Sequence, residues 1–205
     1  MRFKNRTEIQ NLIYSLKFKN FRFGIELWKE QGFAPIQVHS NKVLRVAPGD
    51  LPKECDAIYT LEPGFKIGVK TADCVPLLLA GNSVVCAIHA GWRGLKAGII
   101  ERAIQELSGF CNPEEIIAFI GPSALSCCYE VGKEFSQSFS ELETREGKLY
   151  MDTQKEAISR LIKSGIERFH VVRVCTICNL KLPSYRRDNS KERLYSWIMM
   201  EGDGG

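Results

Sequence analysis

The chain has 205 residues, of which 44% are hydrophobic, and a net charge of +4 from 28 basic and 24 acidic residues. This length predicts one domain, spanning residues 1–205, with a core of ordinary size. The weak charge argues against a nucleic-acid partner, which usually requires an extended basic face. No apolar run approaches the roughly 18 residues that cross a bilayer, so we also expect no membrane partner.

The predicted elements begin, in chain order, with two helices over residues 7–19 and 23–31, and Pro35 ends this part of the chain. Gly81-Asn82 then predicts a tight hairpin turn between two strands. Short apolar runs bounded by turn residues predict six strands in this region: 36–39, 42–46, 56–60, 66–70, 75–80 and 83–89.

Helical spacing of apolar residues appears mainly after residue 90. Helices are predicted over 95–107, 134–142 and 153–163, and strands over 116–120, 169–174 and 194–200. Many hairpin-linked strands with fewer helices favour an α/β (α+β) sandwich, with a mixed β-sheet and flanking helices in a single domain.

Two of the three histidines end predicted strands, at His39 and His89, and each is followed by turn residues. Cys74 lies where one predicted strand gives way to the next. Two imidazoles and one thiolate suit Zn²⁺ and leave a fourth position open for chemistry. The residue pattern alone also allows these side chains to be ordinary core residues. His170, inside an apolar strand, is predicted to be structural.

The absence of a recognisable signal peptide in the N-terminal segment predicts a cytoplasmic protein, in which the eight cysteines stay reduced. Most of them are expected to be small buried hydrophobes. Cys127-Cys128 could form a redox pair. The CxxC spacing of Cys175 and Cys178 is interpreted as coincidence, because Pro183 leaves little room for the helix that a thioredoxin-like role needs.

Seven short motifs follow one another along residues 36–200, and the most specific are TADC and HAGWRG. Together they resemble the YfiH-type family, labelled laccase-domain or polyphenol oxidase proteins and described as purine nucleoside phosphorylases with adenosine deaminase activity. The motifs are Gln37-Val38-His39, Thr71 to Pro76, His89 to Gly94, Gly121-Pro122, Cys127 to Gly132, Cys175-Thr176 and Ser184 to Asp188.

The resemblance implies that His39, Cys74 and His89 are zinc ligands. Two departures from the family pattern are visible. The family usually has a Gly-rich arginine segment ahead of the first histidine, which residues 1–38 do not contain, and it tends to have glycine where this chain has Ser40.

Several charged residues near these motifs are candidates for substrate binding or catalysis. Arg93 follows a Gly-rich turn and could bind phosphate or pair with a local carboxylate. Arg186 and Arg187 could also bind phosphate, and the nearby cluster Lys191 to Arg193 likewise suits a small anion. Glu130 is a candidate pocket residue. Asp73, beside Cys74, is either an acid/base group or a structural residue.

Three functions remain open at this point. The resemblance implies phosphorolysis of adenosine, inosine and methylthioadenosine to free base and ribose 1-phosphate, with deamination of adenosine by a metal-activated water. Alternatively, Cys74 is a nucleophile and His89 its base, in a hydrolase or acyl-transfer enzyme such as a cell-wall precursor editing enzyme.

The third function is the polyphenol oxidase label. Three histidines are too few for a multicopper cluster, although a His₂Cys set resembles a blue copper centre and could explain Cu²⁺ uptake in vitro. The expected partners are a small-molecule nucleoside and phosphate, and the expected assembly is a monomer or a homodimer.

Overall fold

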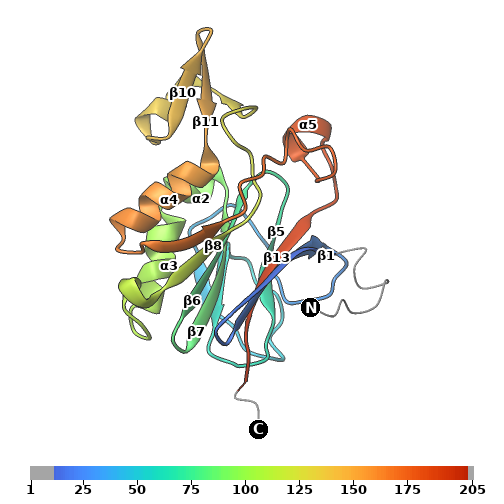
Figure 1. Cartoon of the computed structure of the whole chain (residues 1–205), viewed down its shortest axis with the longest axis vertical. Coiled ribbons are helices and arrows are strands. Elements are labelled where there is room, and N and C mark those ends of the chain that lie inside the picture. The colour runs from blue at the N-terminus through green and yellow to red at the C-terminus, as the bar shows by residue number, and fades with distance from the viewer. Residues whose placement is uncertain (1–11, 203–205) are drawn as a thin grey trace.

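Two β-sheets packed against each other, with helices on the outer face of the larger sheet, make up most of the molecule (Figure 1). The structure is a computed structural model and describes residues 12–202. The larger sheet is mixed and has the strand order β12-β8-β6-β7-β4-β3. Its strands are β3 (Val43–Arg45), β4 (Ala57–Thr60), β6 (Val75–Gly81), β7 (Val84–Ala90), β8 (Ile117–Ile120) and β12 (Arg168–Val171).

The smaller sheet has four antiparallel strands in the order β1-β2-β13-β5. They are β1 (Leu12–Phe18), β2 (Phe21–Leu27), β5 (Ile67–Thr71) and β13 (Leu194–Met200). The chain passes from this sheet to the larger one between β5 and β6, which are separated only by residues 72–74.

Strands β6 and β7 form the centre of the larger sheet, and all their residues are buried. Successive strand residues face opposite sides of a sheet. Leu77 and Leu79 therefore belong to the core on the helical side, whereas Leu78 and Ala80 belong to the core between the two sheets. Burying one such leucine contributes about 1.5–3 kcal/mol, so these two strands hold the three layers together.

The helical layer packs on the larger sheet through the buried sides of its two longest helices. A small three-stranded sheet projects from one end of the molecule (Figure 1). The helices are α2 (Trp92–Lys96), α3 (Ile99–Leu107), α4 (Thr153–Lys163) and α5 (Tyr185–Asp188), with the 3₁₀ helices η1 (Pro113–Glu115) and η2 (Lys133–Gln137). The projecting strands are β9 (Glu130–Val131), β10 (Leu142–Arg145) and β11 (Lys148–Met151).

The predicted α+β sandwich with a mixed sheet and flanking helices is confirmed. The hairpin at Gly81-Asn82, helix 153–163 and strand 194–200 are also correct. Helix 95–107 is divided into α2 and α3 at Gly98, whose φ of 80° interrupts a regular helix. Within residues 12–202, no helix combines the length and the apolar character needed to cross a membrane.

The two helices predicted over 7–19 and 23–31 are wrong in the part that the structure describes, where β1 and β2 form a hairpin. Residues 7–11 lie outside the described residues. In β2, Phe21, Phe23 and Ile25 are buried and alternate with Arg22 and Gly24. This period of two is the strand signal, and the sequence interpretation missed it.

Two further predictions are wrong because carboxylates bind the backbone N–H groups that regular structure would have used. Residues 36–39 form only an isolated bridge at Ile36, since the segment turns toward Asp56. The helix predicted over 134–142 is limited to η2, because the N–H groups of residues 140 and 141 donate to the Glu156 carboxylate.

Candidate metal centre and its cavity

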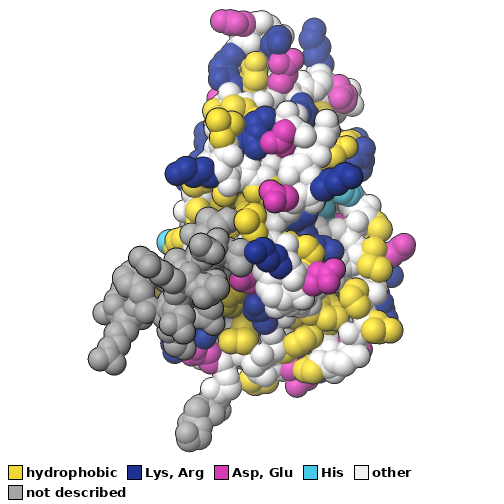
Figure 2. Space-filling view, turned by 90° about the vertical axis from the view of Figure 1, so that its right-hand side faces the viewer, with side chains coloured by type: hydrophobic (Ala, Val, Ile, Leu, Met, Phe, Trp, Pro, Cys, Tyr) yellow, Lys and Arg dark blue, Asp and Glu magenta, His cyan; other side chains and the backbone are white. Residues whose placement is uncertain are grey.

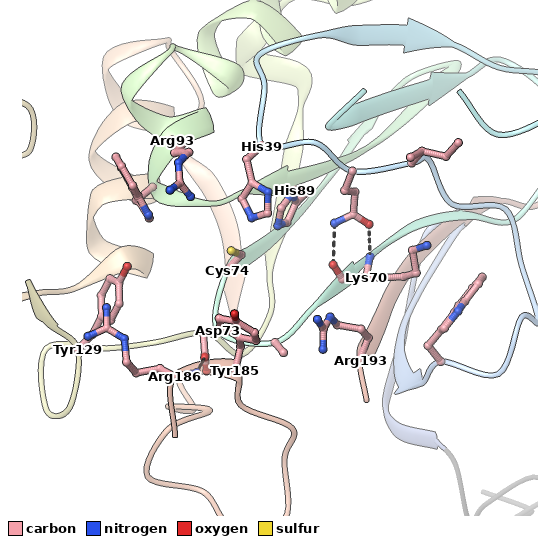
Figure 3. A pocket seen from close by; sticks show the side chains of 15 residues that line it. His39, Lys70, Asp73, Cys74, His89, Arg93, Tyr129, Tyr185, Arg186 and Arg193 are labelled. Atoms are coloured by element: carbon pink, nitrogen blue, oxygen red, sulfur yellow. Dashed lines mark hydrogen bonds between the residues drawn. The ribbon is translucent and has the colours of Figure 1, made fainter. Parts of the chain in front are cut away.

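His39, Cys74 and His89 come together at one end of the two sheets (Figure 3). One donor atom from each of the three side chains lies within 4.8 Å of the other two. His89 is on β7 near its end, and Cys74 is in the crossing between β5 and β6. The crossing brings Cys74 next to His89 because Val75 pairs with Ala90 in the β6–β7 ladder.

His39 reaches the group from a loop that is organised by Asp56. The φ of His39 is 62°, and such a left-handed conformation is strained for a residue other than glycine, at about 1–2 kcal/mol. The buried Asp56 carboxylate stabilises it by accepting the backbone N–H of Val38, His39 and Ser40, at 3.3, 2.9 and 2.6 Å. The Ser40 hydroxyl, absent from the glycine common in the resembled family, adds a fourth bond at 2.8 Å.

The same carboxylate also orients His89. Asp56 Oδ1 lies 2.8 Å from His89 Nδ1, with both side chains buried. Burial would raise the pKa of Asp56, but hydrogen bonds with His89 and Ser40 lower it to about 2. The carboxylate is therefore ionised, holds a proton on Nδ1 and leaves Nε2 of His89 for the cavity. Metal-binding histidines usually have such a carboxylate partner.

Cys74 and His89 shift each other's pKa in opposite directions. Burial would raise the pKa of the Cys74 thiol, but His89 and a hydrogen bond with His39 lower it. Burial would lower the pKa of His89, but Cys74 and Asp56 raise it. Cys74 is thus poised as a thiolate, the form in which cysteine binds metals or acts as a nucleophile.

Gly91 leaves the space in which the three donors meet. A Cβ atom at this position would lie 3.0 Å from Cys74 Sγ and 3.1 Å from His39 Cδ2, so a larger residue would push the ligands apart. Two imidazoles and a thiolate held this closely, with a carboxylate behind one of them, fit a metal ion with three protein ligands.

The three donors line a cavity of about 770 Å³. Figure 2 shows histidine surface beside Lys and Arg side chains on the face in view. Four cationic side chains line the cavity: Lys70, Arg93, Arg186 and Arg193. Four aromatic side chains also line it: Trp28, Trp92, Tyr129 and Tyr185.

Arg93 and Arg186 lie on the same side of the cavity as Tyr129 (Figure 3). The Arg93 guanidinium carbon lies 4.4 Å from the centre of the Trp92 ring, and that of Arg186 lies 4.8 Å from the centre of the Tyr129 ring. Among the described residues, no carboxylate forms an ion pair with Arg93. Both guanidinium groups are therefore supported by aromatic rings and face the cavity as candidate anion donors.

Asp73 lines the cavity, but its carboxylate is already engaged in three hydrogen bonds. It accepts from the hydroxyls of Thr176 and Ser184, at 2.6 and 3.1 Å, and from the backbone N–H of Arg186 at 2.7 Å. Its φ is 89°, a strained value typical of functional sites. This geometry indicates a positioning role, because Asp73 connects the Cys74 segment to the start of α5.

Arg187 and Glu130 do not line the cavity. The Arg187 guanidinium donates to the carbonyls of Thr176, Ile177 and Asn179, at 2.9, 3.0 and 3.2 Å. The Glu130 carboxylate pairs with Lys148 at 3.0 Å on the surface.

Sequence reasoning missed Asp56, and it did not single out Lys70 or the aromatic residues of the cavity. Asp56 directly precedes β4 and belongs to no motif, so no local sequence pattern indicates its role. Lys70 stands just before the TADC motif, and its pKa is lowered by burial and by the nearby Arg193. Its position beside the TADC motif is the one feature of the sequence that could have indicated Lys70 as a cavity residue.

Fold and cavity together define a class: an α+β sandwich protein with a His₂Cys candidate metal centre in a cationic cavity. Residues 19–201 match the family described as multi-copper polyphenol oxidoreductase laccase. The chain belongs to this laccase-domain family, which confirms the resemblance found from the motifs.

Relatives of the chain carry a more specific name. A protein of Aquifex aeolicus named purine nucleoside phosphorylase is 44% identical over 200 residues, covering 97% of both chains. The Escherichia coli protein named purine nucleoside phosphorylase YfiH is 35% identical over 176 residues, which cover 80% of this chain and 72% of that protein.

Solved structures support the same fold. The Bacillus licheniformis protein YfiH superposes with a TM-score of 0.76 at 27% identity, over 82% of this chain and 73% of that one. A Neisseria meningitidis protein superposes with a TM-score of 0.83 at 23% identity, over 94% of this chain and all of that one. The second likeness shows the fold alone.

Proposed function

We propose that the protein is a zinc-dependent purine nucleoside phosphorylase of the cytoplasm, acting on adenosine, inosine and methylthioadenosine, with a slower adenosine deaminase activity. The observation that carries the proposal is the shared cavity, in which His39, Cys74 and His89 lie beside the guanidinium groups of Arg93 and Arg186. The names of the relatives support the choice of substrate class.

Phosphorolysis needs a phosphate held against the ribose. A phosphate oxygen forms a bond to C1′ while the bond from C1′ to the purine nitrogen breaks, and the purine leaves with the electron pair and takes up a proton. Two guanidinium groups suit a dianionic phosphate because each presents several N–H donors in a plane. We assign phosphate binding to Arg93 and Arg186.

To bind a purine, the cavity needs flat side chains that stack on the ring and hydrogen-bonding groups that reach the edge of the base. Tyr129 and Tyr185 line the cavity near Arg186, and Tyr185 is 60% exposed, so its ring is free to stack on a base. Lys70 and Arg193 lie on the other side of the cavity from Arg93 (Figure 3) and suit the polar edge of the base or the sugar hydroxyls.

A zinc ion bound by His39, Cys74 and His89 would supply a Lewis acid and one open coordination position. Asp56 keeps His89 in the tautomer that exposes Nε2, and Gly91 leaves room for the ligands to meet. The proposed deamination, which adds water at C6 of adenosine and expels ammonia, would use the same cavity.

The direct test incubates metal-defined protein with adenosine, inosine and methylthioadenosine, with and without phosphate, and identifies the products by mass. We expect free base and ribose 1-phosphate only with phosphate, and inosine from adenosine without it. Arg93→Ala and Arg186→Ala should each raise the KM for phosphate about tenfold or more, or about 1.4 kcal/mol. Glu130→Gln is the matched control. Free base released equally well with and without phosphate would refute the proposal.

The lowered pKa of Cys74 beside His89 keeps the cysteine-nucleophile alternative open. A zinc-bound thiolate should resist iodoacetamide until a chelator is added. If activity survived metal removal and alkylation of Cys74 then abolished it, the enzyme would be a cysteine hydrolase or acyl-transferase and zinc would have no catalytic part.

A further inference from the structure

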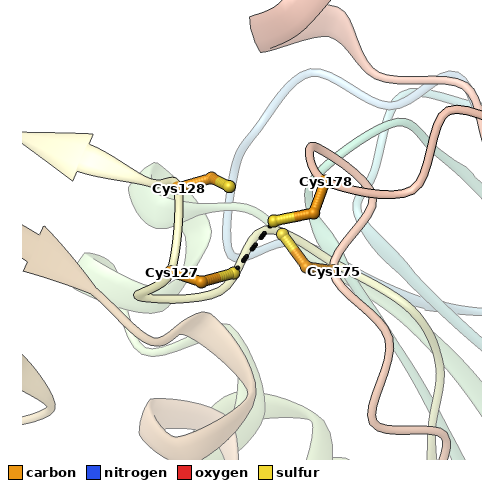
Figure 4. Close-up of side chains that lie close together, drawn as sticks. All are labelled: Cys127, Cys128, Cys175 and Cys178. Carbon is orange, nitrogen blue, oxygen red and sulfur yellow. Dashed lines mark hydrogen bonds between the residues drawn. The ribbon is translucent and has the colours of Figure 1, made fainter.

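A second group of sulfur atoms lies outside the cavity, where two loops meet (Figure 4). The β8–β9 loop, residues 121–129, carries Cys127 and Cys128, and the β12–α5 loop, residues 172–184, carries Cys175 and Cys178. All four Sγ atoms lie within 4.8 Å of one another, and those of Cys127 and Cys178 are 3.2 Å apart.

We propose that these four cysteines form a second, structural metal site that binds one Zn²⁺. Four thiolates around zinc at about 2.3 Å form a tetrahedron whose sulfur atoms are about 3.8 Å apart. The observed separations, 3.2 Å for Cys127 and Cys178 and at most 4.8 Å for any pair, bracket this value and suit one ion rather than a polynuclear cluster. The CxxC spacing interpreted as coincidence thus supplies half of a Cys₄ site. The proposal is independent of the function proposed above.

A dithiol redox centre fits these residues less well. Adjacent cysteines have Cα atoms about 3.8 Å apart, below the 4.4–6.8 Å usual for disulfides, so Cys127 and Cys128 are poorly placed to bond to each other. Catalytic CxxC motifs gain their reactivity at a helix start. Cys175 instead forms an isolated bridge and Cys178 lies in the turn that follows, and the next helix, α5, begins only at Tyr185.

Backbone N–H groups surround one of the four sulfur atoms. The N–H groups of Cys178 and Leu125 donate to the Cys175 sulfur. Such N–H donors commonly support metal-bound thiolates. The Arg187 guanidinium binds the carbonyls of the loop that carries Cys175 and Cys178, and so brings a positive charge close to a site whose bound form is anionic.

A metal ion here would connect two loops that both contribute to the cavity. Tyr129 directly follows Cys128, and Thr176, which binds Asp73, directly follows Cys175. The loops are also joined by the isolated bridge between Ser123 and Cys175 and by the Gln154 amide, which donates to the carbonyls of Gly121 and Val172. The ion would thus fix the position of Tyr129 relative to Asp73 without touching substrate.

Metal analysis of protein purified without chelator tests the proposal. We expect two zinc ions per chain in the wild type, one in Cys178→Ser, one in Cys74→Ser and none in the double variant. Cys74→Ser is the matched control, because it removes one thiol from the other centre. Cys127 and Cys178 are exposed, so serine at either position should not prevent folding, and Cys127→Ser serves as the second variant.

Co²⁺ added to metal-free Cys74→Ser protein identifies the ligands directly. We expect the strong visible bands of a tetrahedral cobalt thiolate, and we expect Cys178→Ser to remove them. A wild type with one zinc that Cys178→Ser leaves in place would overturn the proposal. So would iron in place of zinc, or a disulfide between the two loops, detected by alkylation and mass in protein purified anaerobically without added reductant.

Discussion

In the His39–Cys74–His89 group, three donors face a cavity and a buried carboxylate, Asp56, stands behind them. In the four-cysteine group, four donors surround one point and arginines lie nearby. Zn²⁺ with two neutral imidazoles and one thiolate keeps one net positive charge, which Asp56 balances. Zn²⁺ with four thiolates carries two net negative charges, which suit neighbouring cations.

This difference in donor number and surrounding charge indicates which of the two groups is suited to catalysis. An open coordination position beside cationic side chains can receive a substrate, whereas a closed set of four thiolates can only hold its loops together. The number of donors and the sign of the surrounding charge therefore separate two clusters that a cysteine count alone would treat alike.

The largest expected effect comes from removing one sulfur atom from each group in turn. Cys74→Ser should lower kcat/KM for phosphorolysis by about 100-fold or more, at least about 2.7 kcal/mol of transition-state stabilisation. Cys178→Ser should change it by less than about tenfold, because Cys178 does not line the cavity. Steady-state kinetics with inosine and phosphate measures both. Equal losses in the two variants would show that the groups do not differ in this way.

Asp56→Asn should act on the open group alone. An amide cannot provide the negative charge that keeps the proton on His89 Nδ1, so metal affinity at this group should fall about 10- to 100-fold. Competition with a chromophoric chelator measures the affinity. The four-cysteine group serves as an internal control, since its affinity should not change, and a parallel loss at both groups would point to general unfolding instead.

Stability should depend mainly on the closed group. A structural ion present at 100 times its Kd contributes about 2.7 kcal/mol, and 1 kcal/mol shifts the Tm of a chain this long by about 2–4 °C. Cys178→Ser should therefore lower Tm by about 5–10 °C at saturating zinc. Thermal unfolding of both proteins with and without chelator gives the value. If wild type and variant still differed by this amount after chelation, the ion would not be the cause.

The smallest expected effect concerns Asp152, the N-cap of α4, which accepts from Lys155 and binds Arg173 near Cys127. Burial would raise the pKa of Asp152, but the Arg173 hydrogen bonds lower it. Because the pKa of this carboxyl group is lower in the folded than in the unfolded protein, the carboxylate stabilises the fold above the unfolded pKa of about 3.9. This stabilisation is lost as the pH falls through the folded pKa.

Asp152→Asn, which keeps a capping side chain, should thus cost about 1 kcal/mol at pH 7 and nothing well below pH 4. Urea unfolding at the two pH values checks this. Zinc bound by the four cysteines should not change, because the Arg173 charge remains.

Much of the sandwich and the three donors of the open group could be predicted from the sequence. Strand 75–80, the Gly81-Asn82 turn and helix 153–163 have local patterns that their tertiary surroundings reinforce. His39, Cys74 and His89 lie in motif segments, and His89 also lies near the end of β7, so these three donors could be predicted from the sequence.

The remaining features depend on contacts between distant segments. Asp56 is important because three N–H groups from residues 38–40 and one imidazole converge on it, and no local pattern encodes such convergence. The four-cysteine group joins residues that are far apart in the chain. Neither Cys127-Cys128 nor the Cys175–Cys178 pair predicts a metal site by itself. β1 and β2 are strands and not the predicted helices, because Phe21, Phe23 and Ile25 alternate along β2 and are buried in the core.

The place of β13 between β2 and β5 has a consequence for the order in which a growing chain can fold. β2 and β5 leave the ribosome early, but neither is paired with the other, and each needs β13 as its neighbour. The smaller sheet therefore closes only after Leu194–Met200 has been synthesised. Arg193 directly precedes this strand and lines the cavity, so nascent chains would complete that wall of the binding site last.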